Sequence, residues 1–212
     1  MAKVAWFGFA TSATGIFNRK TAFYTDQTKK YPRDVALARK LLAEAGYKGQ
    51  PLRLLPLPFG EAWSRTAEMV RQNLQEAGFK IELVSADLPG VMARTSNWEF
   101  ALSLTYLFQL GDPALGVARS YVGSEIKKGS PFNNVGGYQN PKVDALFERG
   151  GREIDPKKRA EIYADVQRTL SDDVAAAWLL DLNFPTVYRS KIEDLVTSGL
   201  GLTDSLARAS IK

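Results

Sequence analysis

The chain contains no cysteine and no histidine among its 212 residues. Without cysteine it can form no disulfide, no thiolate nucleophile and no zinc-thiolate site, and the absence of histidine removes the commonest general base and metal ligand. These absences exclude most hydrolytic sites, so we expect no catalytic residue, no cofactor and no metal. A chain without cysteine is compatible with either redox compartment, and it suits an oxidising one because no thiol can mispair.

Long apolar runs and dense basic stretches are absent as well. No run approaches the roughly 18 apolar residues that spanning a bilayer requires. The net charge of +5 is spread thinly, with only pairs such as Lys29 and Lys30. Since a phosphate footprint needs clustered cations, we expect no nucleic-acid partner. The opening MAKVAWFGF lacks the apolar core and cleavage site of a secretory signal, so we expect no signal peptide in this chain.

Enzyme motifs are missing too. The stretch GFATSATG has two glycines but no Lys-Ser or Lys-Thr after the second, and no G-x-S-x-G elbow occurs. Carboxylates such as Asp172, Asp173 and Asp181 could in principle serve a glycoside hydrolase. Asp172 and Asp173 follow a predicted helix, however, where acids are commonly solvated.

Three segments are expected along the chain. Residues 1–33 form an irregular arm, rich in Gly, Ser and Thr, and the start of the lobe. Residues 34–194 form an α/β lobe, and residues 195–212 a weakly patterned C-terminal tail. Within the lobe, a strand at 52–57, a helix at 61–77 and a strand at 79–84 form a βαβ unit. This unit should be parallel and right-handed.

The remaining elements complete a mixed α/β sheet flanked by helices. Asp34 and Asp155 are good helix N-caps, and Asn140-Pro141 is a turn and the start of a helix. Asp144 can hydrogen-bond the backbone of the preceding loop. Trp63, Trp98 and Trp178 fall at apolar-periodic positions and are expected in the core. Further helices are expected from 34 to 45, around 88–94, from 141 and from 155, further strands at 99–107, 175–182 and 184–189, and a long irregular segment at 108–140.

Several motifs in order resemble the extracytoplasmic solute-binding proteins of family 5, which are the peptide-, nickel- and opine-type binding components of ABC importers. The resemblance covers nearly the whole chain and includes the arm G-F-A-T-S-A-T-G-I-F-N. Its other motifs are D-x-x-x-A-R-K-L-L-A-E-A-G-Y at 34–47, A-E-M-V-R-Q-N-L-Q-E-A-G-F-K-I-E-L at 67–83, G-D-P at 111–113, N-N-V-G-G-Y-Q-N-P-K-V-D-A-L at 133–146 and R-A-E-I-Y-A-D-V-Q-R-T-L at 159–170.

The resemblance implies the C-terminal lobe of a type II (cluster C) periplasmic binding protein, without its N-terminal lobe. The whole protein would be periplasmic or otherwise extracytoplasmic, would bind a small solute in the cleft between the lobes, and would deliver it to the permease subunits of an ABC transporter. The solute could be a peptide, an opine, a sugar or a metal chelate. The face left bare by the missing lobe would expose apolar surface and favour a homodimer.

The resemblance also implies a ligand site. Peptide-binding members carry an Asp shortly before G-D-P that meets the ligand's amino terminus, after a Gly-Trp pair. Gln109 and Tyr106 stand at the positions of that Asp and Trp, which favours a neutral or differently charged solute. Asp112 is also expected to fix its loop through an Asp-Pro turn. The complete set of candidate ligand-binding residues is Tyr106, Phe108, Gln109, Asp112, Asn133, Asn134 and Tyr138.

Two other classes of function stay open at this point. One is a stand-alone interaction module that binds a partner through the bare face. The other is a carboxylate-dependent glycoside hydrolase, in which Asp112 and Asp181 would be required for turnover. The long aromatic-rich segment on an α/β scaffold, without histidine, cysteine or an acid pair at catalytic spacing, favours solute binding.

Overall fold

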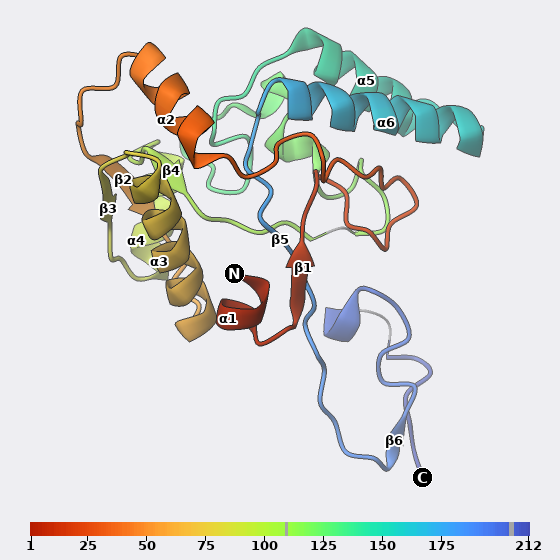
Figure 1. The fold of residues 1–212 in the computed structure, drawn as a ribbon. Helices are drawn as coiled ribbons and strands as arrows, with labels where there is room; N and C mark the ends of the chain where they lie inside the picture. The colour runs from red at the N-terminus through yellow and green to blue at the C-terminus, as the bar shows by residue number, and fades with distance from the viewer. Residues whose placement is uncertain (109, 204–205) are drawn as a thin grey trace.

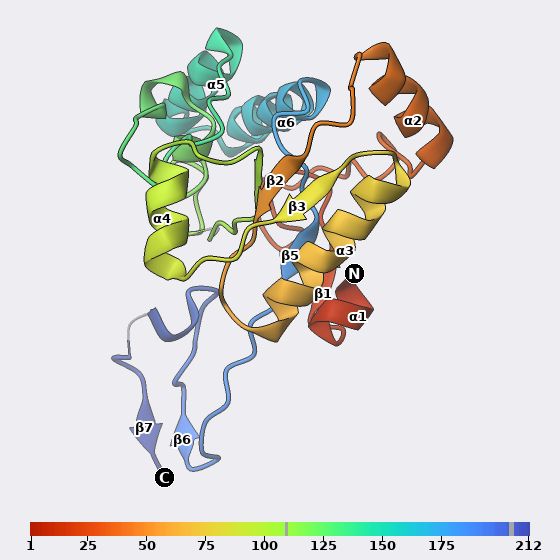
Figure 2. The ribbon, with the colours of Figure 1, turned by 90° about the vertical axis from the view of Figure 1, so that its left-hand side faces the viewer.

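The structure is a computed structural model that describes residues 1–108, 110–203 and 206–212. A three-stranded parallel sheet with its helices forms one part of the molecule. Two helices that pack on each other, α5 (Pro141–Arg152) and α6 (Pro156–Asp172), lie beside it (Figure 1). The C-terminal segment extends away from both parts (Figures 1 and 2).

The predicted βαβ unit is confirmed. It consists of β2 (Leu52–Leu55), α3 (Glu61–Glu76) and β3 (Ile81–Leu83), and β2 pairs with β3 in parallel with Leu54 opposite Leu83. On the other edge β2 pairs in parallel with β4 (Leu102–Ser103). Because β2 pairs with both other strands, the strand order is β3-β2-β4. The chain passes from β3 to β4 through α4 (Leu88–Ser96).

The arm at residues 1–33 is not irregular throughout, which corrects the expectation. It begins with α1 (Ala2–Trp6) and continues into β1 (Ala10–Ser12), which pairs antiparallel with β5 (Leu180–Leu182). These elements form a core against the sheet because their apolar side chains meet those of β2, α3 and α4. The buried members of this core are Ala5, Trp6, Ala10, Leu55, Leu57, Trp63 and Val91.

A second core lies between α5 (Pro141–Arg152) and α6 (Pro156–Asp172). Both helices start where predicted: Asn140 accepts a hydrogen bond from the Lys142 amide, and Asp155 accepts from the amides of Lys157 and Lys158. The arm inserts into this core. Its buried members are Ile16, Phe17, Val117, Tyr121, Val143, Leu146, Phe147, Ile162, Tyr163, Val166 and Leu170.

The predicted irregular segment at 108–140 contains two short 3-10 turns, η1 (Ala118–Ser120) and η2 (Gly123–Glu125). It is fixed to the second core by buried side chains, of which Tyr121 is 6% exposed. As predicted, Asp144 holds the segment by accepting a hydrogen bond from the Gly123 amide at 2.9 Å.

Three predicted strands are shorter than expected or missing. Of 99–107 only β4 is paired, of 175–182 only β5 is paired, and 184–189 is not a strand. Apolar side chains in these stretches are used in other ways, for example at Trp178, which donates its indole N–H to the Tyr121 hydroxyl at 3.0 Å. Apolar content alone therefore overestimated strand length.

The helix capped by Asp34 is present as α2 (Val35–Glu44), and none of its residues is buried. One burial expectation is wrong. Trp98, expected in the core, is 44% exposed. It has a positive φ of 61° and follows the C-cap of α4, so its side chain leaves the face that the helical period defines.

The C-terminal segment carries β6 (Ile192–Glu193), η3 (Gly201–Thr203) and β7 (Ser210–Ile211), with β6 and β7 paired antiparallel. Several of its apolar side chains are exposed, including Val187 at 92% and Ile211 at 71%. Among the described residues, no helix has both the length and the apolar content needed to cross a membrane.

A close contact between α5 and α6 gives a test of the fold. A Cβ added at Gly150 would lie 2.8 Å from Cζ of Tyr163, whose side chain is fully buried. Overpacking costs about 1–3 kcal/mol, which exceeds the roughly 1 kcal/mol that alanine gains over glycine in a helix. We therefore expect Gly150→Ala to lower the Tm in thermal unfolding.

Gly151→Ala is the matched control, because its Cβ would meet only the Ala114 Cβ, at 3.9 Å. This variant should keep or raise the Tm. Equal shifts in the two variants would contradict the close contact at Gly150.

Candidate ligand-binding site

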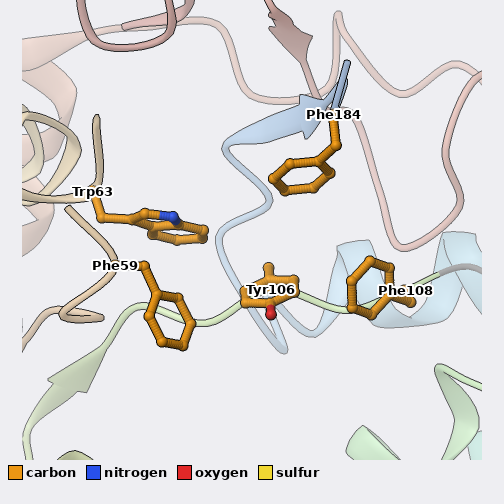
Figure 3. A pocket seen from close by; sticks show the side chains of 5 residues that line it. All are labelled: Phe59, Trp63, Tyr106, Phe108 and Phe184. Carbon is orange, nitrogen blue, oxygen red and sulfur yellow. The ribbon is translucent and has the colours of Figure 1, made fainter. Parts of the chain in front are cut away.

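Five aromatic side chains form a pocket of about 250 Å³. Tyr106 lies at its centre, and the other four ring centroids lie 5.3 to 6.4 Å from that of Tyr106. Figure 3 shows Tyr106 flanked by two rings, with the other two above it in this view. We call this group the aromatic bowl; its members are Phe59, Trp63, Tyr106, Phe108 and Phe184.

The sheet topology explains why these side chains meet. Phe59 follows β2, and Tyr106 and Phe108 follow β4, so all three lie beyond the carboxyl ends of neighbouring parallel strands. The chain leaves β2 toward β3 on one side and returns to β4 on the other, which makes the gap between β2 and β4 a topological switch point. Ligands of open α/β sheets bind at such a point.

The first core supports the bowl from behind. Trp63 is 8% exposed, and its ring contacts that of Trp6 at 5.3 Å in an edge-on arrangement. Trp6 is held in turn, since its indole N–H donates to the Thr66 hydroxyl at 2.9 Å. Phe108 and Phe184 are each 58% exposed and form the rim. The bowl thus combines a rigid wall with a rim open to solvent.

The bowl is apolar but has two polar groups. Within residues 1–108, 110–203 and 206–212, neither the indole N–H of Trp63 nor the hydroxyl of Tyr106 has a hydrogen-bond partner, and none of the described lining residues is charged. Two potential donors therefore remain available to a bound molecule.

Sequence reasoning identified two members of the bowl, Tyr106 and Phe108, as ligand-binding candidates. It assigned Trp63 to the core, and the structure shows that this residue is both a core residue and a pocket wall. Phe59 and Phe184 were missed. The position of Phe59 just after a strand of the βαβ unit was the available signal; Phe184 lay in a stretch expected to be a strand. Gln109 lies outside the described residues.

Asp112 and Asn133 are not part of the bowl. Asp112 forms an ion pair with Arg159 at 2.6 Å and accepts a hydrogen bond from the Ala114 amide at 2.9 Å. Asn133 donates to Glu125 at 2.5 Å. Asp112 thus fixes its loop, as its Asp-Pro sequence predicts, and ties that loop to α6.

Asn134 and Tyr138 also lie away from the bowl. Asn134 is 1% exposed, donates to the carbonyls of Val122 and Tyr138, and accepts from the Tyr138 amide, so its side chain is fully used within the loop. The Tyr138 hydroxyl donates to Asp173 at 2.5 Å. Burial and this hydrogen bond raise the pKa of Tyr138, and the same bond lowers the pKa of Asp173. These contacts indicate structural roles.

The acids considered for catalysis are also engaged elsewhere. Asp172 pairs with Lys30, and Asp173 accepts from Tyr138 and Asn140. Asp181 lies on β5, 3.8 Å from the Arg19 guanidinium, with one carboxylate oxygen buried and without a hydrogen bond. Among the described residues no group of three or more acids could hold a metal ion.

An α/β scaffold with an aromatic pocket at its switch point is suited to ligand binding, and the family comparison agrees. The chain belongs to the bacterial extracellular solute-binding proteins of family 5: the model described as "Bacterial extracellular solute-binding proteins, family 5 Middle" matches residues 1–128. This is a family of binding proteins and not of enzymes.

Similar proteins are much longer than this chain. The probable di/tripeptide-binding protein 5 of Pseudomonas aeruginosa is 27% identical over 97% of the chain and 39% of its own length. The nickel-binding protein NikA of Staphylococcus aureus is 25% identical over 92% of the chain and 39% of its own length. The chain thus spans about two fifths of the length of these relatives.

Solved structures show the same fold. A dipeptide-binding protein from a Pseudoalteromonas species, in complex with Met-Leu, superposes on all of this chain and 42% of its own with a TM-score of 0.78 at 19% identity. The structure of NikA from Staphylococcus aureus with Ni(L-His)2 gives 0.74 at 21% identity, over 100% of this chain and 45% of its own.

The buried carboxylate of Asp181 generates a pH-dependent prediction. Burial raises its pKa above the ordinary 3.8, so the folded state opposes ionisation and loses stability as the pH rises through and above that value. Asp181→Asn cannot ionise. We expect it to raise the Tm at pH 7 by about 2–4 °C, the shift that about 1 kcal/mol produces in a domain of this size, and to raise it less at pH 4.

Asp165→Asn is the control, since the Asp165 side chain is 47% exposed in a surface pair with Arg168 and should have little effect. A lower Tm for Asp181→Asn at pH 7 would mean that the attraction of Arg19 outweighs the cost of burial.

Proposed function

We propose that this chain is the C-terminal lobe of the substrate-binding component of an ABC importer, and that the aromatic bowl forms one wall of its ligand cleft. The observation that carries the proposal is the position of the bowl at the switch point between β2 and β4, where its rim faces solvent. Membership of family 5 supports a solute as the ligand.

The exposure of the rim favours a second wall of the ligand cleft, supplied by another lobe. Phe108 and Phe184 leave more than half of their surface in water, which is unfavourable for large aromatic rings. A second lobe that closed over the bowl would remove this surface from solvent together with the ligand. Since the relatives named above are more than twice as long as the part that the chain matches, they have the length for such a lobe.

The same reasoning sets the expected affinity and partners. One wall alone buries a ligand on one side, so the chain by itself should bind weakly and the two-lobed protein more tightly. The whole protein would work outside the cytoplasm and pass its solute to the permease subunits of the importer. Dipeptides and nickel complexes, which its relatives are named for or solved with, mark the range of solutes to test.

The indole N–H signals of the four tryptophans provide a direct test by two-dimensional NMR. Trp63 lines the bowl, whereas Trp178 donates to Tyr121 in the second core and serves as an internal reference. A panel of dipeptides, nickel-histidine, opines and neutral sugars is added to the labelled chain. We expect at least one solute to shift the Trp63 signal and leave Trp178 unchanged.

Ring deletions then locate the site. Phe108→Ala and Phe184→Ala should each weaken that binding about three- to tenfold, because each removes an aromatic contact from the rim. Phe132→Ala, which removes an exposed ring that does not line the bowl, is the control and should bind normally. Solutes that bind without moving the Trp63 signal, or that ignore both rim deletions, would contradict the proposal.

A further inference from the structure

We propose that the part of the ligand held in the aromatic bowl is an uncharged ring that carries an oxygen acceptor. This inference deepens the proposed function and rests on it. Neutral sugars and amide-bearing aromatic compounds both have this chemistry, and the experiment below separates them.

The shape of the bowl points to a ring. Tyr106 meets Phe108 at an interplanar angle of 84° and Phe59 at 69°, so the walls stand steeply on the central ring. Such walls offer flat apolar contact to a planar or nearly planar group from more than one direction. The volume of about 250 Å³ lies below the roughly 300–1,000 Å³ of pockets for drug-sized ligands, which suits one ring or a small molecule.

The two available donors point to an acceptor on that ring. Trp63 is 8% exposed, and its indole N–H has no hydrogen-bond partner among the described residues. This nitrogen is not one of the fully buried unpaired atoms of the described residues, so it is open to the pocket. A molecule that displaces water from the bowl must therefore supply an oxygen or leave the donor unpaired. The hydroxyl of Tyr106, also without a partner in the described chain, can donate to a second oxygen or accept from a ligand hydroxyl.

The charges around the bowl argue against an ionised ligand group. An ammonium group loses its hydration in such a pocket and needs a carboxylate partner. The described acids closest in sequence to bowl residues are already paired: Glu61 with Arg65 at 2.5 Å, and Asp112 with Arg159 at 2.6 Å.

Asp181, three residues before Phe184, is directed elsewhere. Its neighbours Leu180 and Leu182 pack on the first core, which contains Trp63, so the alternation along β5 places the Asp181 carboxylate on the other side, toward Arg19. An anionic ligand group would find no ion-pair partner either, because no described lining residue is a cation.

A quaternary ammonium group is the main competitor. Aromatic faces attract such cations without any hydrogen bond. It offers no acceptor to the Trp63 indole, however, and would leave that donor without a partner. A neutral ring with an oxygen acceptor contacts the aromatic faces of the bowl and also accepts a hydrogen bond from the Trp63 indole N–H.

The experiment compares four probes on the 212-residue chain by the Trp63 indole signal: methyl β-glucopyranoside, benzamide, the dipeptide Met-Leu and tetramethylammonium. We expect the glucoside or benzamide to shift the signal at lower concentration than the other two. A response to the glucoside alone identifies a sugar-like ligand, and a response to benzamide alone an aromatic amide.

A conservative variant tests the hydrogen bond. Tyr106→Phe keeps the ring and removes only the hydroxyl, and it should weaken the neutral probe about three- to tenfold. Tyr188→Phe is the control, because Tyr188 is 44% exposed and does not line the bowl. If Tyr106→Phe binds the probe unchanged and the Trp63 signal still shifts, the ligand oxygen accepts only from the Trp63 indole N–H. That result would overturn the role of the Tyr106 hydroxyl.

The remaining outcomes separate this inference from the proposed function. If Met-Leu or tetramethylammonium shifts the Trp63 signal more strongly than either neutral probe, the ligand class is wrong while solute binding at the bowl stands. If no solute of any class moves that signal in a chain whose circular dichroism shows it folded, both proposals fail.

Discussion

The parallel pairing of β2 with both β3 and β4 is the constraint on which the rest of the fold depends. Because the chain steps outward to β3 and then back past β2 to β4, the segments that leave β2 and β4 diverge at the same edge of the sheet. Aromatic residues placed in those segments are thereby brought together from positions more than forty apart in sequence. The bowl is a consequence of strand order as much as of its own residues.

The second core, between α5 and α6, stabilises a loop and does not line the bowl. It anchors the long segment at 108–140, which would otherwise lack regular structure, through the buried amide of Asn134, the ion pair of Asp112 with Arg159 and the hydrogen bond of Asp144 to Gly123. These polar residues resemble a binding site in sequence because loops rich in Asn, Asp and Tyr often carry function. Here their side chains form the hydrogen bonds and the ion pair that hold the loop.

Features governed by neighbouring residues were predictable from the sequence. The caps at Asp34 and Asp155, the helix start at Asn140-Pro141 and the βαβ unit depend on local hydrogen bonds and on apolar periodicity. Both can be read from the sequence. The inclusion of Phe59 and Phe184 in the bowl depends on how distant segments pack, and no local pattern encodes it. Strand length failed for a related reason: at 99–107 and 175–182, apolar side chains on both sides of the short strands β4 and β5 pack without extending those strands.

The double role of Trp63, in the core and in the pocket wall, has a consequence for how ligand preference can change over evolution. Substitutions at Trp63 alter the first core and carry a cost in folding, whereas those at the exposed Phe108 and Phe184 do not. Ligand specificity should therefore diverge first through substitutions at Phe108 and Phe184, while Trp63 is retained beneath them.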